Sequence, residues 1–449
     1  MRDTPRSRKA VLLAAAALLG TAVPFAGGVA WSQTQASSEE QELARFLAVW
    51  QRVRGAYVDK VGDKELVDGA IEGMLSNLDP HSSYMQASDF QNLRLQTDGN
   101  YGGLGLTVTM EDGAVKVQTP TEDAPAARAG VKAGDFITHV DGELLYGGTL
   151  DDAVAKMRGA PGSQVKITLI RPGRDKPFDV TLTRENIVLR PVKWEVKDGV
   201  GILNVNAFNA QTYDQLAEGF AAIDKATGGR PLGYVLDLRS NPGGLLDQAI
   251  RVSDAFLDKG EIVSERGRNP RDNDSWSATP GDLAKGRPVV VLIDAGSASA
   301  AEIVAGALQD HRRAIVMGET SFGKGSVQTL LPLTDDSALR LTTARYYTPS
   351  GRSVQAGGIK PDLAVPQLTD PDYKTRTRVR EADLRRHLLA EKEVKDEVLE
   401  DDPTPDPRFA ATPAELEKQG IKDFQLHYAL STLKRLATGP TAANARASR

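Results

Sequence analysis

The stretch GYVLDLRSNPGGLLDQAI, residues 233–250, reads as an apolar strand, an Asn-Pro-Gly-Gly turn and a helix. A second stretch, VVVLIDAGSASAAEIVAGAL at 289–308, repeats the order of strand, turn and helix. Near-continuous apolar strands are typical of sheets that are covered by helices on both faces. The alternation of strands with helices predicts a layered α/β core over residues 187–366. Its further strands are expected at 199–208, 313–319 and 339–348.

The N-terminus has the organisation of a secretory signal. A basic start, MRDTPRSRK, precedes an uncharged stretch at 10–30 and then a polar segment. Ala30 and Ala36 are candidate cleavage points, so residues 1–36 are assigned to a signal peptide or a membrane anchor. The uncharged stretch is long enough to span a bilayer if it is retained. In both cases the rest of the chain is expected outside the cytoplasm, in a bacterial periplasm.

The composition excludes several classes of function. The 449 residues contain no cysteine, which excludes disulfides, thiol nucleophiles and cysteine-zinc sites. The net charge of −5 and the lack of a basic tract argue against nucleic-acid binding. We expect no metal or other cofactor.

Helical regions flank the predicted core. Residues 37–96 place apolar side chains at helical spacing, and His81, after a break at Asp79-Pro80, is interpreted as a structural polar residue. Residues 367–449 are charged, mainly helical and end in a segment of disordered composition. These helices could pair between subunits of a homo-oligomer or pack within one chain, and the sequence leaves both open. An adaptor protein also stays open.

Residues 97–186 contain short β-rich runs divided by glycine. The turn YGGLGL at 101–106 and the segment AGVKAGDFITHVDG at 129–142 have the separation found in PDZ domains, which this region resembles. A PDZ domain pairs an extended peptide with a sheet edge and holds its terminal carboxylate with backbone N–H groups. The four apolar positions of that site are equally compatible with a place in the core. By the resemblance, the peptide site consists of Gly103, Leu104, Gly105, Leu106, Val154 and Met157.

A third motif, GETSFGKGS at 318–326, begins like a phosphate-binding P-loop. A P-loop needs Ser or Thr directly after its lysine to bind magnesium, and Gly325 stands there instead. The alternative is that Lys324 acts as the general base for a serine, which requires a pKa lowered by desolvation. Phe322 and two glycines surround the lysine with no adjacent charge, which suits this alternative. The motif alone leaves open that Lys324 is an ordinary lysine on a surface loop, which is the usual place for a lysine.

Two serines, Ser297 and Ser299, stand at the start of the helix that follows the second strand. A helix N-terminus presents unpaired N–H groups that can stabilise an oxyanion, although a serine there is most often only an N-cap. None of the five histidines lies beside these turns and no Gly-x-Ser-x-Gly elbow is present. A Ser-His-Asp triad is therefore not expected.

Taken together, the motifs resemble those of the C-terminal processing peptidases, also called tail-specific proteases. The resemblance implies a peptidase core of the crotonase-like or ClpP-like type, preceded in the chain by a PDZ domain. The matching stretches run in the family's order over residues 40–365: LDPHSSYM, the PDZ segment, LDLRSNPGG, GSASAAEI, FGKGSVQ and GRSVQAGGIKPD.

The resemblance also implies roles for individual residues. The family's serine and lysine lie 25 positions apart, which selects Ser299 as nucleophile and Lys324 as base (324 − 299 = 25). Gln328 would orient the lysine amine, and the oxyanion would be held by the N–H of Ala300 and that of Gly243 or Gly244. Two positions, Asp294 and Ala301, differ from the family's usual Asn and Ser.

The implied function is that of a serine endopeptidase acting on exported proteins. Its PDZ domain would select them by their apolar C-terminal residues, and neither metal nor nucleotide would be needed. An alternative from a different class is a catalytically inactive periplasmic PDZ scaffold. The presence of Ser299, Lys324 and Gln328 favours the enzyme.

Overall fold

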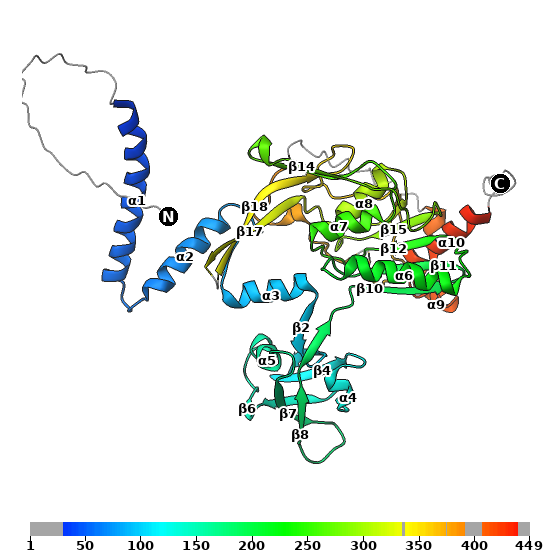
Figure 1. Ribbon diagram of the computed structural model, residues 1–449, viewed down its shortest axis with the longest axis horizontal. Helices are drawn as coiled ribbons and strands as arrows, with labels where there is room; N and C mark the ends of the chain where they lie inside the picture. The colour runs from blue at the N-terminus through cyan, green and yellow to red at the C-terminus, as the bar shows by residue number, and fades with distance from the viewer. Residues whose placement is uncertain (1–29, 335–336, 374, 391–405, 439–449) are drawn as a thin grey trace, which may run out of the picture. The chain divides into compact units, whose positions relative to one another are not determined.

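The computed structural model describes residues 30–334, 337–373, 375–390 and 406–438 (Figure 1). The predicted signal stretch before Ala30 and the C-terminal end after residue 438 lie outside the described residues. The chain forms two compact units, residues 1–71 and 72–449.

In the first unit, the described residues form α1 (Ala30–Ala56) and most of α2 (Asp63–Ser76). Arg54 near the end of α1 donates to Asp63 at the start of α2, with an N–O distance of 3.5 Å. The apolar side chains Leu43, Phe46 and Leu47 of α1 are exposed in this single chain. None of the described helices is both long and apolar enough to span a bilayer.

The second unit begins with a connecting segment that contains β1 (Ser83–Met85) and α3 (Ala87–Asp98). Gly99 ends α3 in the left-handed conformation, with φ of +69°. This is the conformation that glycine adopts at a helix end without steric cost.

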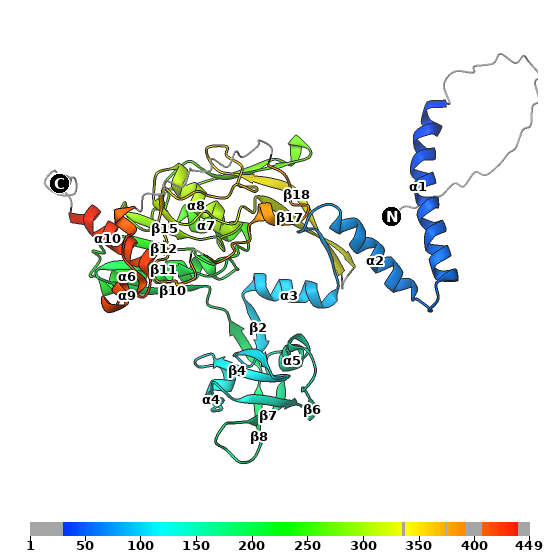
Figure 2. The ribbon, with the colours of Figure 1, turned by 180° about the vertical axis from the view of Figure 1, so that it is seen from behind.

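The PDZ-like region forms its own small core. Figure 2 shows its strands and helices, from β2 to β8, gathered in one group. Strands β3, β4, β5, β7 and β8 make one antiparallel sheet in that order, β6 extends β5, and β3 lies at an edge. β2 pairs with β9, so the two ends of the region lie side by side. Its elements are β2 (Asn100–Gly103), β3 (Leu106–Glu111), β4 (Ala114–Pro120), α4 (Pro125–Arg128), β5 (Phe136–Val140), β6 (Glu143–Leu144), α5 (Leu150–Met157), β7 (Gln164–Ile170), β8 (Phe178–Thr183) and β9 (Glu185–Val188).

The layered core is built on a six-stranded sheet in the order β10-β11-β12-β15-β16-β19. β10 is antiparallel to β11, and the remaining neighbours are parallel. Every residue of β12 and β15 is buried, as the apolar runs predicted. The strands are β10 (Val192–Lys197), β11 (Val200–Val205), β12 (Tyr234–Asp237), β15 (Val289–Ile293), β16 (Ile315–Gly318) and β19 (Leu363–Ala364).

Helices cover both faces of this sheet. Successive side chains of a strand point to opposite faces, so each strand contributes to two hydrophobic clusters. Leu203, Leu236 and Val291 pack in one cluster with α6 (Thr212–Ala226), α7 (Leu246–Asp254) and α8 (Ala300–Asp310). Their neighbours in sequence pack in a second cluster with α9 (Pro413–Lys418) and α10 (Phe424–Thr438). Figure 1 shows α10, in red, beside β12 and β15.

A second, antiparallel sheet is centred on β18 (Ser337–Tyr347). β18 pairs with β1, with β13 (Glu261–Gly267) and with β17 (Ser326–Thr334), while β14 (Asp274–Ser277) pairs with β13. The strand predicted at 339–348 is therefore present, but it lies in this sheet and not among the parallel strands. Its middle residues are half-buried or exposed, unlike those of β12 and β15.

Short 3-10 turns complete the described secondary structure: η1 (Pro270–Asp272), η2 (Glu381–Asp383) and η3 (Pro407–Phe409). Of the C-terminal region predicted to be mainly helical, the described residues 367–390 contain only η2.

Candidate active site

Three turns meet at one edge of the parallel sheet. β12, β15 and β16 are neighbours and parallel, so their carboxyl ends lie at the same edge. The turns that leave these ends are 238–245, 294–299 and 319–325. They carry the predicted oxyanion glycines, the serines and the lysine, respectively. The carboxyl edge of a parallel sheet is where α/β proteins commonly bind ligands.

Hydrogen bonds join the three turns to one another. Ala298 donates its N–H to the carbonyl of Asn241 (2.9 Å), and Phe322 donates to the carbonyl of Ser297 (3.0 Å). Asp294 accepts from the N–H and hydroxyl of Ser240, at 2.7 and 3.0 Å. The aspartate that replaces the family's usual asparagine therefore holds the glycine turn against the serine turn.

Ser299 occupies a strained backbone position directly before α8. Its φ is +53° and its ψ is −114°, and 9% of the residue is exposed. A non-glycine residue in this region costs on the order of 1–3 kcal/mol, and such positions cluster at functional sites. The N–H of Ser299 donates to the Glu302 carboxylate at 2.7 Å.

Glu302 holds the lysine loop to the start of α8. Its side chain is fully buried and also accepts from the Ser321 hydroxyl, the Gly323 N–H and the Lys324 N–H. Burial raises the pKa of Glu302 to about 7, against these hydrogen bonds, which favour its charged form. One carboxylate thus bonds to the backbone of both Ser299 and Lys324 and brings the two residues together.

The amine of Lys324 lies in an environment that disfavours its charged form. Burial is the largest cause that lowers the pKa of Lys324, and the positive charge of Arg340 lowers it further. The carboxylates of Glu381, Glu302 and Asp79 act in the opposite direction, but the net shift is downward. A lowered pKa increases the fraction of neutral amine, the form that can accept a proton.

Ser297 and Gln328 are engaged elsewhere. The Ser297 hydroxyl is fully buried, donates to the carbonyl of Leu238 at 2.8 Å and accepts from the Asp294 N–H at 2.9 Å. The Gln328 amide donates to the Ser326 hydroxyl at 2.9 Å. Its second hydrogen bond, at 3.3 Å, goes to Thr342. Among the described residues, Gln328 makes no hydrogen bond to the Lys324 amine.

The two glycines of the 238–245 turn, Gly243 and Gly244, lie where neighbouring atoms leave no room for a side chain. A Cβ on Gly243 would lie 2.8 Å from the Cβ of Ser299 and 2.9 Å from the nitrogen of Ala300. A Cβ on Gly244 would lie 2.0 Å from the carbonyl oxygen of Phe208. Gly243 therefore lies against the serine and the first N–H group of α8. Its own N–H donates to Asn241 Oδ1 at 2.8 Å.

The geometry of the 318–326 turn does not suit a P-loop. A P-loop leads into a helix and directs its backbone N–H groups at phosphates. Here the turn leads into strand β17, and the N–H groups of Gly323 and Lys324 donate to Glu302. Within the described ranges, no cluster of three or more His, Asp or Glu side chains is placed to hold a metal ion.

The residues of the predicted PDZ peptide site lie around the start of β3, an edge strand of its sheet, and on α5. Leu104 and Met157 are buried, whereas Leu106 and Val154 are half-buried against the same core. Gly105 has φ of +71°, and a Cβ there would lie 2.2 Å from the Cβ of Ala124. A sheet edge that no strand of the domain occupies can pair with an added peptide.

The interpretation of the sequence missed several polar residues that pack near Lys324. Asp79 is buried and accepts from the N–H groups of His81 and Ser82, both at 2.8 Å. His81 Nε2 donates to the buried carboxylate of Glu381 at 2.8 Å. For Glu302 a local signal existed, because Ser299-x-x-Glu302 fits the capping-box pattern. For His81 and Glu381, 300 positions apart, no local signal existed.

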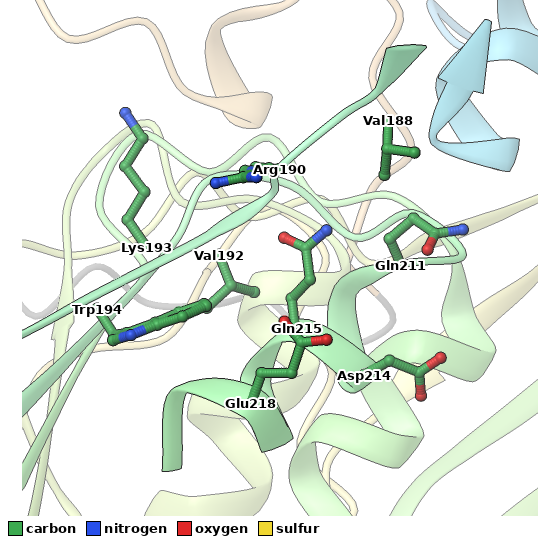
Figure 3. A pocket seen from close by; sticks show the side chains of 9 residues that line it. All are labelled: Val188, Arg190, Val192, Lys193, Trp194, Gln211, Asp214, Gln215 and Glu218. Carbon is green, nitrogen blue, oxygen red and sulfur yellow. The ribbon is translucent and has the colours of Figure 1, made fainter. Parts of the chain in front are cut away.

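A separate pocket of about 710 Å³ lies between β10 and α6 (Figure 3). Its lining includes Trp194 of β10 and Gln215 and Glu218 of α6. None of the residues predicted for catalysis or peptide binding lines this pocket.

Comparison with known proteins assigns the chain to a family. The signature of Peptidase family S41 matches residues 199–365, and that of a PDZ domain matches residues 102–182. The signature of the activating protease CtpB N-terminal domain matches residues 26–89. The carboxy-terminal-processing protease of Bartonella bacilliformis is 47% identical over 392 residues, which cover 86% of this chain and 89% of that protein. The chain belongs to the carboxy-terminal-processing protease family.

One further relative agrees with this assignment. The carboxy-terminal processing protease CtpA of Bacillus subtilis is 34% identical over 343 residues, which cover 76% of this chain and 72% of the relative. A solved structure, the photosystem II D1 C-terminal processing protease, is 31% identical and covers 76% of this chain and 98% of its own, with a TM-score of 0.43. The predicted family, the mixed α/β fold with a PDZ domain and the assignment as a serine-type peptidase are confirmed.

Proposed function

We propose that this protease cleaves peptide bonds with Ser299 as nucleophile and Lys324 as general base. The observation that carries the proposal is the buried Glu302 carboxylate, which accepts from the backbone N–H groups of both residues. The strained backbone of Ser299 and the lowered pKa of Lys324 support it. Ser297 is a poor alternative nucleophile because its hydroxyl is fully buried and already bonded.

In the proposed reaction, neutral Lys324 takes the proton of the Ser299 hydroxyl while Oγ attacks the carbonyl carbon of the substrate. The resulting ammonium donates that proton to the nitrogen of the leaving peptide, and the scissile C–N bond breaks. A water molecule then attacks the acyl-enzyme and gives a proton to Lys324, which returns one to Ser299 as the ester bond breaks. By the resemblance, Gln328 is assigned to orient the lysine amine, which requires its amide to turn from Ser326 and Thr342 toward the amine during these transfers.

Two backbone N–H groups would stabilise the oxyanion. One is the N–H of Ala300, the first residue of α8, where the helix dipole adds to the effect. The second belongs to the glycine turn. Since the Gly243 N–H already donates to Asn241, we assign the second donor to Gly244. The close approach of Gly243 to Ser299, and of Gly244 to the carbonyl oxygen of Phe208, is consistent with the need for glycine at both positions.

We further propose that the PDZ domain selects substrates with apolar C-terminal residues. The free edge of β3 would pair with the substrate's last residues, and Leu106 and Val154 would contact the terminal side chain. The boundaries assigned from the sequence, 97–186 for the PDZ domain and 187–366 for the peptidase core, are part of this proposal. The signal-like N-terminal sequence supports action on exported proteins in the periplasm.

The proposal is tested by cleavage of an unfolded protein that ends in apolar residues. The Ser299→Ala variant is expected to lose cleavage while its circular dichroism spectrum and thermal unfolding match the wild type. Ser297→Ala is the matched control, because it removes a hydroxyl two residues away in the same turn. We expect it to retain substantial activity. Full activity of Ser299→Ala would overturn the mechanism, and an inactive wild-type protein would favour a PDZ scaffold.

A further inference from the structure

The buried carboxylate of Glu381 has no role in the proposed reaction, yet it lies close to Lys324. Its side chain is 0% exposed, and its charge acts on the lysine. His81 Nε2 approaches both carboxylate oxygens, at 2.8 and 3.1 Å, and the imidazole is largely buried. A buried carboxylate needs such partners, because burial without them disfavours its charged form. The pair therefore requires an explanation.

Glu381 is bonded to both sides of the lysine loop. Its N–H donates to the carbonyl of Phe322 at 3.1 Å. Its side chain accepts from the Gln355 amide at 2.9 Å, and Gln355 in turn accepts from the N–H of Gly325 at 3.0 Å. Phe322 and Gly325 flank the segment that contains Lys324. A shift of Glu381 would therefore change the path of the backbone that carries the lysine.

His81 is fixed on its other side by the segment 79–85. Its N–H donates to Asp79, and its carbonyl accepts from Arg340 Nε at 3.0 Å. β1 in this segment pairs with β18 in register from Ser83 with Arg340 to Met85 with Ala338. His81 thus joins a docked segment, far from the lysine in sequence, to the loop that holds the lysine.

We propose that His81 and Glu381 are a pair of positioning residues that align Lys324 only when the 79–85 segment is docked. This inference rests on the proposed role of Lys324 as the base. Neither residue is assigned a bond to substrate. Their effect passes through Gln355 and the backbone on each side of the lysine.

The charge of Glu381 gives this pair a signature that simple packing would not have. The charged groups with the largest effect on the pKa of Lys324 are Arg340, which lowers it, and Glu381, Glu302 and Asp79, which raise it. Glu381→Gln removes one negative charge, so the pKa of Lys324 falls and the acid limb of the pH–rate profile moves to lower pH. His81→Ala keeps the carboxylate but removes its donor. The carboxylate is then less neutralised, so the limb moves to higher pH.

The test measures kcat, KM and the pH–rate profile of the full chain with a short fluorogenic peptide that does not need the PDZ domain. We expect His81→Ala to lower kcat about tenfold or more and to leave KM within about twofold, because alignment and not binding is lost. The midpoints of His81→Ala and Glu381→Gln are expected to move in opposite directions by about 0.5 pH unit. His81→Gln, whose amide Nε2 can replace the imidazole donor, is expected to restore kcat to within about threefold of the wild type.

A double variant separates action through Glu381 from an independent role. If His81 acts through Glu381, the variant with both His81→Ala and Glu381→Gln is no slower than the slower single variant. Multiplied losses would overturn the inference, as would wild-type kcat and midpoints in both single variants. If His81→Ala does not fold, the other two variants decide. The inference is overturned if Glu381→Gln leaves the midpoint of the pH–rate profile unchanged. It is also overturned if His81→Gln loses as much kcat as Lys324→Ala. Activity of Lys324→Ala would instead overturn the proposed function, and this inference with it.

Discussion

The proposed catalytic edge, which consists of the turns after β12, β15 and β16, differs from the proposed PDZ peptide site in how its backbone polar groups are bonded. At the catalytic edge, the N–H groups of Ser299, Gly323 and Lys324 all donate to one buried carboxylate. In the PDZ domain, β3 lies at the edge of its sheet, where no strand of the domain pairs with its outer side. The first region is closed by its own hydrogen bonds, and the second is open to an added strand.

The difference matches what each region has to do. A catalytic group must be held in one geometry before the substrate arrives, and buried hydrogen bonds provide that order. A site that binds many different C-termini obtains its affinity from hydrogen bonds to the peptide main chain. It needs only an apolar contact for the last side chain. Substitutions at the catalytic edge should therefore abolish turnover, whereas those in the PDZ domain should change which substrates are cleaved.

The largest effect is expected from the lysine. Lys324→Ala should lower kcat by on the order of 10⁴-fold, because it removes the proposed acceptor of the serine proton. In the wild type, activity should rise with pH, since only the neutral amine is a base, and the midpoint should lie below the ordinary lysine pKa of 10.5. A pH–rate profile with the short fluorogenic peptide measures both quantities.

Lys324→Arg is the matched control for this prediction. Arginine keeps the positive charge but stays protonated, so it cannot act as a base. We expect it to be as inactive as the alanine variant. Near-normal turnover would show that the site requires a positive charge and not a proton acceptor.

A smaller but still large loss is expected from Glu302→Gln. The amide keeps one accepting oxygen but replaces the other with a donor, which faces N–H groups that already need an acceptor. We expect kcat to fall by about 10- to 100-fold and the thermal midpoint to fall as well, since each unsatisfied buried group costs about 1–3 kcal/mol. Glu415→Gln, at an exposed capping box of α9, is the matched control and should leave kcat unchanged.

An unchanged kcat in Glu302→Gln would show that the closed hydrogen-bond network is not needed for alignment. The contrast between the two regions would then lose its physical basis. A fall in thermal midpoint without a fall in kcat would assign Glu302 to stability alone.

Local sequence patterns predicted most of the fold. The apolar runs within 233–250 and 289–308 predicted buried strands, each followed by a turn and a helix, and they correspond to β12 and β15. The strand at 339–348 was found, but its place in a second sheet could not be inferred, because half-buried and fully buried runs look alike over short lengths.

Less of the candidate site could be predicted from the sequence alone. Ser299 could be separated from Ser297 only by resemblance, since both precede the same helix. The roles of Asp294 and Glu302 depend on turns that arrive from other strands, and the pairing of His81 with Glu381 depends on the docking of β1 against β18. Contacts between distant segments leave little trace in the local pattern.

The PDZ site should show a selective effect. Val154→Glu places a charge at a half-buried position of α5 that packs against the PDZ core, and an apolar terminal side chain would then lose its proposed partner. We expect cleavage of long substrates with apolar C-termini to fall about tenfold, while cleavage of the short peptide stays within about twofold. Val154→Ile is the control that keeps the surface apolar.

The outcome also separates two roles of the domain. Loss on long substrates alone would make the PDZ domain a tether, whereas loss on both substrates would make it a gate for the catalytic edge. Unchanged cleavage of the long substrates would contradict both roles. Gly105→Glu is a poorer test than Val154→Glu, because any side chain at Gly105 would meet Ala124 and disturb the fold.

The smallest effect on turnover is expected from a buried charge that belongs only to the PDZ fold. Asp135 accepts from the Lys132 N–H and from two nitrogens of Arg171, at 2.6 and 2.7 Å. Against the effect of burial, these partners lower the pKa of Asp135 below its ordinary value of 3.8. Its contribution to stability is therefore present above that value and is lost as the pH falls through the lowered pKa.

Asp135→Asn should destabilise the PDZ domain by about 1–3 kcal/mol and leave cleavage of the short peptide unchanged. Hydrogen exchange of the full chain measures this, because faster exchange should be confined to residues 99–188 while the amides of β12 and β15 keep their protection. Asp179→Asn, an exposed partner of Lys166, is the control and should change exchange little. If Asp135→Asn also slows short-peptide cleavage, the order of the PDZ domain is transmitted to the catalytic edge, and the two regions are not independent.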